Sequence, residues 1–220
     1  MLQRIPLWVL ILGLVFWVLA LGLFGFAYRT HVAAEKSLPS NPWFTGMSWM
    51  HSPKNWIAPN FTLPDHRGQQ ISLAQFHGRV TLVSFTSSVC KQQCPLVGRA
   101  LATVDRQLGP LAKKTVLLNV SVDPEADTLK TVNHFARKMG WTPYTWYYVW
   151  AARSKMRPIW RAYDVYVPNP PPILKPGKSV IHLAAVAIVD QTGNIRGFMS
   201  YPFVPSALAG AVRDLLQEHV

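Results

Sequence analysis

Four short apolar runs, separated by segments with helical periodicity, constrain the fold of this chain more than any other feature. The runs have the length and the β-branched or aromatic content of strands that are buried on both faces. They cover residues 79–85, 115–122, 144–150 and 184–190. Apolar residues recur at helical spacing in the intervals, at residues 95–108, 128–139 and 154–163. This alternation predicts an α/β domain with a parallel sheet that is covered by helices on both sides.

The C-terminal part adds an antiparallel element to this plan. The turn-forming segment "DQTGN" at residues 190–194 predicts that residues 195–201 pair with the fourth run as a hairpin, which makes the central sheet mixed. A last helix is predicted from Ser206 to Glu218, with Ser206 as its N-cap. Five prolines within residues 167–179 exclude a helix or a central strand there and predict an exposed loop.

An uncharged apolar run at residues 7–28 predicts one N-terminal transmembrane helix. At 1.5 Å per residue it would span about 33 Å, enough for the hydrocarbon core of a bilayer. A cleaved signal peptide is the alternative, although its apolar region usually spans only about 7–15 residues. Arg4 before the run and Arg29 and Lys36 after it leave the orientation undecided. The predicted organisation is a stub at 1–6, the membrane helix at 7–28, an irregular lead-in at 29–57 and a globular domain at 58–220.

The formal net charge of +12 could suggest a nucleic-acid partner, but it equally fits a generally basic surface, anionic lipid head groups or an acidic protein partner. The lysines and arginines are scattered, and no basic run marks a nucleic-acid patch. The lead-in also holds ligand types for soft metals, at Met47, Met50 and His51, although these residues are equally suited to packing.

The two cysteines of the chain, Cys90 and Cys94, lie in "SVCKQQCP", between the first predicted strand and the helix that follows. A pair at this spacing cannot form a disulfide framework. Pro95 suits the first position of the helix, which puts Cys94 at the N-cap and Cys90 in the preceding loop. The positive end of the helix dipole and the charge of Lys91 predict that both thiols are more acidic than an ordinary cysteine.

The cysteine pair fits two chemistries, a redox dithiol or a site for a soft metal. A metal needs at least one more ligand, and His182 is the best candidate. It lies at the start of the stretch "IHLAAVAIVD", which runs from directly after the proline-rich loop into the fourth predicted strand. Two thiolates and one imidazole suit Cu(I), whereas tetrahedral structural zinc would want a fourth ligand. The other histidines are predicted to be surface residues, namely His31, His51, His66, His77, His134 and His219.

Three segments occur in order between about residues 60 and 200, namely "FTLPDHRGQQISLAQFHGRVTLVSFTSSVCKQQCP", "LLNVSVDPEADTLKTVNHFARKMG" and "HLAAVAIVDQTGNIRGF". Together they resemble the SCO/SenC family of copper-binding assembly factors for cytochrome c oxidase. The resemblance implies a thioredoxin-like fold and copper, Cu(I) or Cu(II), held by Cys90, Cys94 and His182. It also implies a single N-terminal anchor, with the domain on the periplasmic, extracytoplasmic side of a bacterial cell membrane.

The function that follows from the resemblance is that of a metallochaperone for a haem–copper oxidase. Its partners would be the copper-site subunit of the oxidase, a copper donor and a thiol reductant. Two alternatives stay open. One is a membrane-bound thiol–disulfide oxidoreductase in which Cys90 attacks and Cys94 resolves, and the other is a copper or redox sensor.

The motif departs from the family pattern at two places. Lys91 and Gln92 follow the first cysteine, where the family usually has Pro and then Asp or Asn. Val180 and Ile181 precede His182 in place of the usual polar context. All three ligand types are retained. Asp123 of "SVDP" matches a family residue near the site and is also suited to forming a turn before proline.

Overall fold

The computed structural model describes residues 17, 21–22, 56–141, 145–167 and 185–218. Contacts divide the chain into two units, Met1–Phe44 and Thr45–Val220. The described residues of the first unit, Trp17, Leu21 and Gly22, are helical. The rest of the predicted membrane helix at 7–28 lies outside the described residues. Within the described ranges, no helix combines the length and the apolar character needed to cross a bilayer.

The second unit contains a five-stranded mixed sheet with the strand order β5-β4-β3-β6-β7. The strands are β3 (Val80–Thr86), β4 (Thr115–Ser121), β5 (Trp146–Val149), β6 (Ala185–Val189) and β7 (Ile195–Ser200). The first three are parallel to one another. β6 is antiparallel to β3, so the predicted parallel pairing is wrong for the fourth run, and β7 is antiparallel to β6, as predicted. The predicted α/β class and mixed sheet are confirmed.

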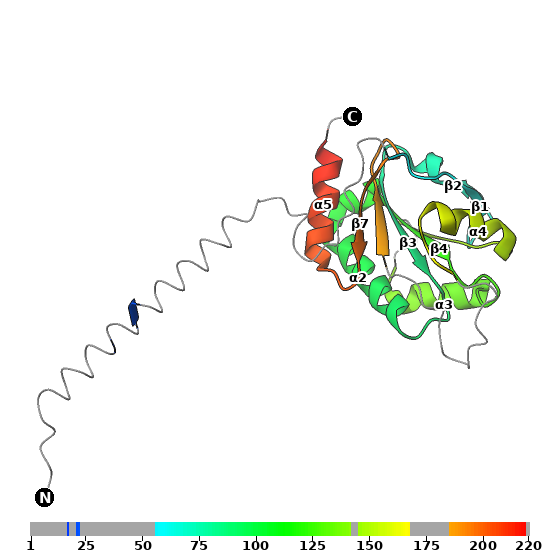
Figure 1. The fold of residues 1–220 in the computed structure, drawn as a ribbon, viewed down its shortest axis with the longest axis horizontal. Coiled ribbons are helices and arrows are strands. Elements are labelled where there is room, and N and C mark those ends of the chain that lie inside the picture. Colours follow the sequence, from blue (N-terminus) through cyan, green and yellow to red (C-terminus); the bar gives the residue numbers. More distant parts are fainter. Residues whose placement is uncertain (1–16, 18–20, 23–55, 142–144, 168–184, 219–220) are drawn as a thin grey trace, which may run out of the picture. The chain divides into compact units, whose positions relative to one another are not determined.

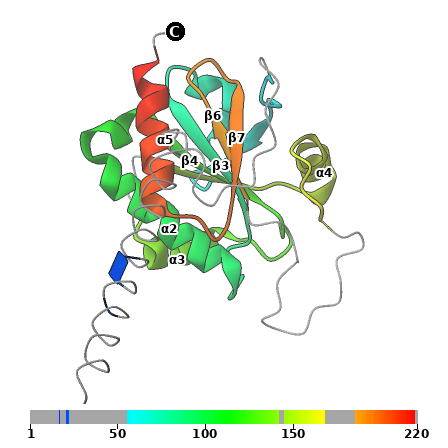
Figure 2. The ribbon, with the colours of Figure 1, turned by 60° about the vertical axis from the view of Figure 1, so that its left-hand side comes forward.

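Helices cover both faces of the sheet (Figures 1 and 2). One face carries α2 (Gln93–Leu108), α3 (Leu129–Met139) and α5 (Pro205–Gln217), and the other carries α4 (Arg153–Ala162). Short elements complete the unit: β1 (Thr62–Pro64), β2 (Gln70–Ser72), η2 (Leu73–Phe76) and η3 (Gly109–Lys114). Every residue of β3 and β4 is buried, because both faces of these central strands are covered.

The core beneath α4 is built from alternate residues of the central strands. Val83 and Phe85 of β3 share a buried cluster with Leu118 of β4 and with Met156 and Trp160 of α4. The indole Nε1 of Trp160 also donates to the carbonyl of Ser121, at 2.8 Å, so α4 is fixed to the end of β4. This bond holds α4 close to the edge of the sheet at which the cysteines lie.

Two helix starts differ from the prediction. α2 begins at Gln93, two residues early, with Gln92 at the N-cap. α5 begins at Pro205 with Val204 at the N-cap, so Ser206 is inside the helix and does not cap it. Proline at the first helical position lacks the N–H that would be left unsatisfied there, which favours this start over Ser206.

Most of the predicted proline-rich loop, residues 168–179, lies outside the described residues.

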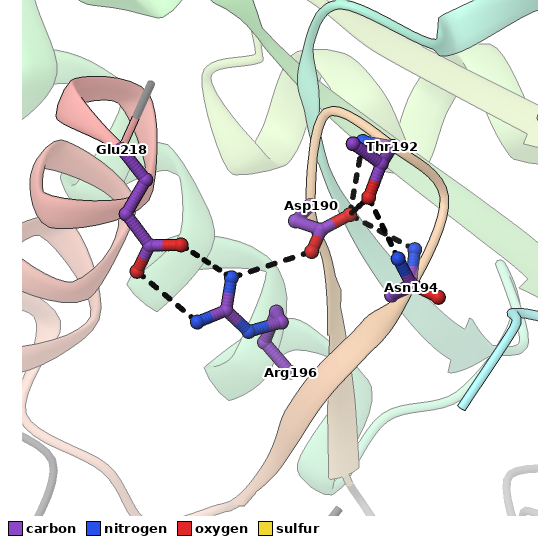
Figure 3. A network of polar contacts seen from close by, with 5 residues as sticks. All are labelled: Asp190, Thr192, Asn194, Arg196 and Glu218. Atoms are coloured by element: carbon purple, nitrogen blue, oxygen red, sulfur yellow. Dashed lines mark hydrogen bonds and ion pairs between the residues drawn. The ribbon is translucent and has the colours of Figure 1, made fainter. Parts of the chain in front are cut away.

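The predicted turn after β6 is confirmed, and its Asp190 organises it (Figure 3). Oδ1 of Asp190 accepts hydrogen bonds from the backbone N–H and hydroxyl of Thr192, at 2.9 and 2.7 Å, and from the N–H of Asn194, at 2.9 Å. The guanidinium of Arg196 lies 3.3 Å from Asp190 and 2.6 Å from the carboxylate of Glu218. This network joins the turn to the end of α5.

Candidate metal centre

The parallel register of the central strands brings distant loops to one edge of the sheet. Thr86, the last residue of β3, pairs with Ser121, the last residue of β4. Val149 at the end of β5 pairs with Val120, one residue earlier on β4. The loop that carries Cys90 and the loop of residues 122–128 therefore leave the sheet at the same place. The carboxyl edge of parallel strands is where open α/β sheets place their functional sites.

Cys90 and Cys94 both lie at this edge, as predicted. Cys90 follows a turn in which its N–H donates to the carbonyl of Ser87, at 3.2 Å. Cys94 is the second residue of α2, so its predicted N-cap position is wrong, and Pro95 takes the third helical position instead of the first. The two side chains are buried, with 7% of Cys90 and 2% of Cys94 exposed.

The two cysteines are thiols in direct contact, and no disulfide joins them. The hydrogen bond between their side chains raises the pKa of Cys94 well above its usual value, and burial raises it further. The prediction that both thiols are unusually acidic is therefore wrong for Cys94. Its hydrogen bond to Cys90 and its removal from water outweigh the helix dipole and a hydrogen bond from the backbone of Ser87. The side chain of Lys91 is exposed.

Two acidic side chains of the loop after β4, Asp123 and Asp127, contact the loop that carries the cysteines. Burial, and then the charges of Asp127 and Glu125, raise the pKa of Asp123, whose carboxylate accepts a hydrogen bond from the Ser87 hydroxyl. Glu125 forms a two-point ion pair with Arg153 of α4, with both N···O distances at 2.7 Å. The negative charge of Asp127 also contributes to the raised pKa of Cys94. An environment of this sign favours a cation at the dithiol.

Asp127 is a residue of this site that the sequence analysis missed. Its carboxylate, in a residue that is 4% exposed, accepts four hydrogen bonds. The donors are the N–H and hydroxyl of Ser88, at 2.8 and 2.6 Å, the Ser121 hydroxyl at 2.6 Å and the Tyr148 hydroxyl at 2.7 Å. In the sequence, Asp127 before Thr128 is typical of a helix start, which gave no reason to expect a bond to the cysteine loop.

The histidine predictions have mixed outcomes. His182, the expected third ligand, lies outside the described residues. Among the residues that are described, no group of three or more His, Cys, Asp and Glu side chains could hold a metal ion. His77 and His134 are exposed as predicted. His66 is buried, against the prediction, because its ring stacks on Trp146 with 3.9 Å between centroids.

Comparison with known proteins agrees with this fold. The family model described as SCO1/SenC matches residues 50–217. A SCO1 protein homolog of Bacillus subtilis is 28% identical over 91 residues, which is 41% of this chain and 47% of the homolog. The chain thus aligns with about half of that curated relative.

Solved structures match most of the chain. ScoI of Bradyrhizobium japonicum, solved with copper bound, has a TM-score of 0.62 at 24% identity, covering 73% of this chain and 99% of that chain. BsSco, described as a member of the Sco family of cytochrome c oxidase assembly proteins with a disulfide switch, has a TM-score of 0.65 at 20% identity, covering 76% and 97%. The fold is that of these thioredoxin-like proteins, and the family model spans more than half of the sequence. The chain belongs to the SCO1/SenC family.

Proposed function

We propose that this chain is a membrane-anchored copper chaperone that carries copper to the copper site of a haem–copper oxidase. The observation that carries the proposal is the pair of adjacent buried thiols at the carboxyl edge of the sheet, in a SCO1/SenC chain. Copper is the cargo, and Cys90 and Cys94 would hold it as thiolates, with His182 as the third ligand. Residues 7–28 would anchor the domain on the extracytoplasmic side of the membrane.

The donor set and its surroundings support a soft, positively charged cargo. Thiolates select Cu(I) over hard cations, and an imidazole is an equally suitable ligand. The raised pKa of Cys94 means that this thiol keeps its proton at neutral pH, so a bound metal must displace that proton. The charge of Asp127 acts on Cys94, and negative charge at this place favours the binding of a cation.

A copper titration tests the proposal. We would reduce the full chain in mild detergent and titrate it anaerobically with Cu(I) and then with Cu(II). Wild type and the matched control His134→Ala, which alters an exposed histidine on α3, are expected to hold one copper per chain. The double variant Cys90→Ser, Cys94→Ser is expected to lose copper, and His182→Ala to lose it or retain it weakly. Equal retention by wild type and the double variant would contradict the dithiol site, and equal retention by His182→Ala would contradict the third ligand.

The charge of Lys91 gives a second, smaller prediction. Two thiolates and Cu(I) carry a net charge of −1, which Lys91 would partly offset. We expect Lys91→Glu to weaken Cu(I) retention by about two- to fivefold and to raise the pKa of both thiols, as befits an exposed charge. Lys113→Glu is the matched control, because it makes the same charge change on an exposed residue before β4, at the opposite edge of the sheet. Equal retention by the two variants would show that Lys91 acts only through net charge.

Thiol–disulfide exchange is the second candidate function. The side chains of Cys90 and Cys94 are hydrogen-bonded, so the two sulfurs are near enough for a disulfide to form between them. Cys90 is the more exposed of the two. In this reaction Cys90 attacks a substrate disulfide and Cys94 resolves the mixed disulfide, so two protein thiols are oxidised as one substrate disulfide is reduced. Efficient disulfide reduction by a chain that binds no copper would favour this function.

A further inference from the structure

Asp127 joins three segments that are far apart in the sequence. One carboxylate oxygen accepts both hydrogen bonds from Ser88, in the loop after β3, and the other accepts those from Ser121 and Tyr148, near the ends of β4 and β5. The Ser88 hydroxyl also lies 2.7 Å from the hydroxyl of Thr131 in the first turn of α3. The carboxylate therefore ties the cysteine loop to two strands, and the Ser88 hydroxyl ties the same loop to α3.

The bonds to Ser88 fix the path of the chain into Cys90. Ser88 is two residues before Cys90, and the turn that leads to Cys90 is closed by the carbonyl of Ser87. The Tyr148 hydroxyl, which is bonded to Asp127, also lies 3.2 Å from the carbonyl of Thr86, where the loop begins. Thr86 and Ser88, the latter two residues before Cys90, are thus both held from the Asp127 side, while Cys94 is part of α2.

We propose that Asp127 is a positioning residue that keeps the Cys90 loop against α2, and thereby sets the equilibrium between the dithiol and the disulfide of Cys90 and Cys94. Two thiols that are held close form a disulfide more readily than two thiols on a loose loop, because less freedom is lost on closure. The inference rests on the proposed function only in that it takes Cys90 and Cys94 to be the functional thiols of the site.

Asp190 offers a matched control for a merely structural role. Its carboxylate accepts three hydrogen bonds at Oδ1 and pairs with Arg196 at Oδ2 (Figure 3). It follows β6, whose Val189 pairs with Thr81 near the start of β3. Asp190 therefore holds a comparable network at the opposite edge of the sheet, away from the thiols.

The test is a redox equilibration of the full chain without metal. Glutathione disulfide oxidises the two thiols to one protein disulfide and yields two molecules of glutathione, and the fraction oxidised is measured by alkylation of the remaining thiols. We expect Asp127→Ala to shift this equilibrium toward the dithiol by about tenfold, which is about 30 mV for a two-electron couple. For Asp190→Ala the equilibrium constant is expected to stay within about twofold of the wild-type value, because a distant, independent site has little effect on the thiols.

Asp127→Asn separates positioning from charge. Its carbonyl can still accept from Ser88, and its amide can donate to the hydroxyls of Ser121 and Tyr148, so it is expected to restore most of the wild-type equilibrium. If Asp127→Ala does not fold, Ser88→Ala replaces it and should shift the equilibrium by about threefold, the worth of one net hydrogen bond.

Three results would overturn the inference: a wild-type equilibrium in folded Asp127→Ala and Ser88→Ala, an equal shift in Asp190→Ala, or Asp127→Asn behaving as Asp127→Ala does. The redox equilibration contains no metal. A wild-type chain that fails to bind copper would therefore refute the proposed function without changing the outcome of the redox test.

Discussion

Between pH 6.5 and pH 4 the domain is expected to lose up to about 3 kcal/mol of its free energy of unfolding through one side chain, His66. Burial, and then the charge of Arg67, lower the pKa of this histidine, Asp65 opposes them, and the net result is a pKa of about 4. The unfolded chain takes up the proton near pH 6.5 and the folded chain only near pH 4. The contribution of His66 is therefore complete above pH 6.5 and is lost as the pH falls, at about 1.36 kcal/mol per pH unit.

Urea unfolding at pH 7.5, 6, 5 and 4 would measure this loss. Other groups also titrate in this range, so the quantity of interest is the difference from His66→Phe, which keeps an aromatic ring beside Trp146 but cannot take up a proton. The matched control is His134→Phe, at an exposed position of α3. If His66→Phe loses as much stability on acidification as wild type does, the burial of His66 is not the source.

Substitution of Gly98 is expected to have the other large effect, because two helices touch at this residue. A Cβ at Gly98 of α2 would lie 2.7 Å from both Cγ and Sδ of Met139, and 3.4 Å from the ring of Phe135, both on α3. The Gly98 carbonyl also accepts a hydrogen bond from the indole of Trp141, at 2.9 Å. Overpacking of this kind costs about 1–3 kcal/mol, and we expect Gly98→Val to reach or exceed the upper end.

Gly210 is the matched control for Gly98. It is also an interior helical glycine, in α5, but a Cβ there would meet nothing within 4 Å. Gly210→Ala is expected to stabilise the domain by about 0.5–1 kcal/mol through helix propensity, whereas Gly98→Ala is expected to destabilise it. Thermal and urea unfolding would measure both. Two alanine variants that change stability in the same direction would contradict the close approach of α2 and α3.

The strands and helices of the domain were largely predictable because the central strands are buried on both faces. Such strands give continuous apolar runs that differ clearly from helical periodicity. The hairpin of β1 and β2 was not predicted, since each strand has only three residues. The direction of β6 was also missed, because an apolar run does not indicate whether it pairs parallel or antiparallel with the neighbouring strand.

The candidate site was predictable where it depends on local sequence. The position of Cys90 and Cys94 at a strand-to-helix junction is confirmed. The acidity of Cys94 was wrong because it depends on the partner thiol and on burial, which the helix dipole alone does not represent. Asp127 and His66 were missed because their partners lie far away along the chain, with Asp127 binding Ser88 and Tyr148, and His66 stacking on Trp146.

The central position of β3 also means that its two neighbouring strands are synthesised at different times. β3 pairs on one side with β6, whose first residue, Ala185, is made about 95 residues after Cys90. At about 5–20 residues per second, the ribosome needs roughly 5–20 s to cover that distance. During this interval one edge of the strand that leads to the cysteines has no partner. The two thiols are therefore made several seconds before the sheet beside them is complete.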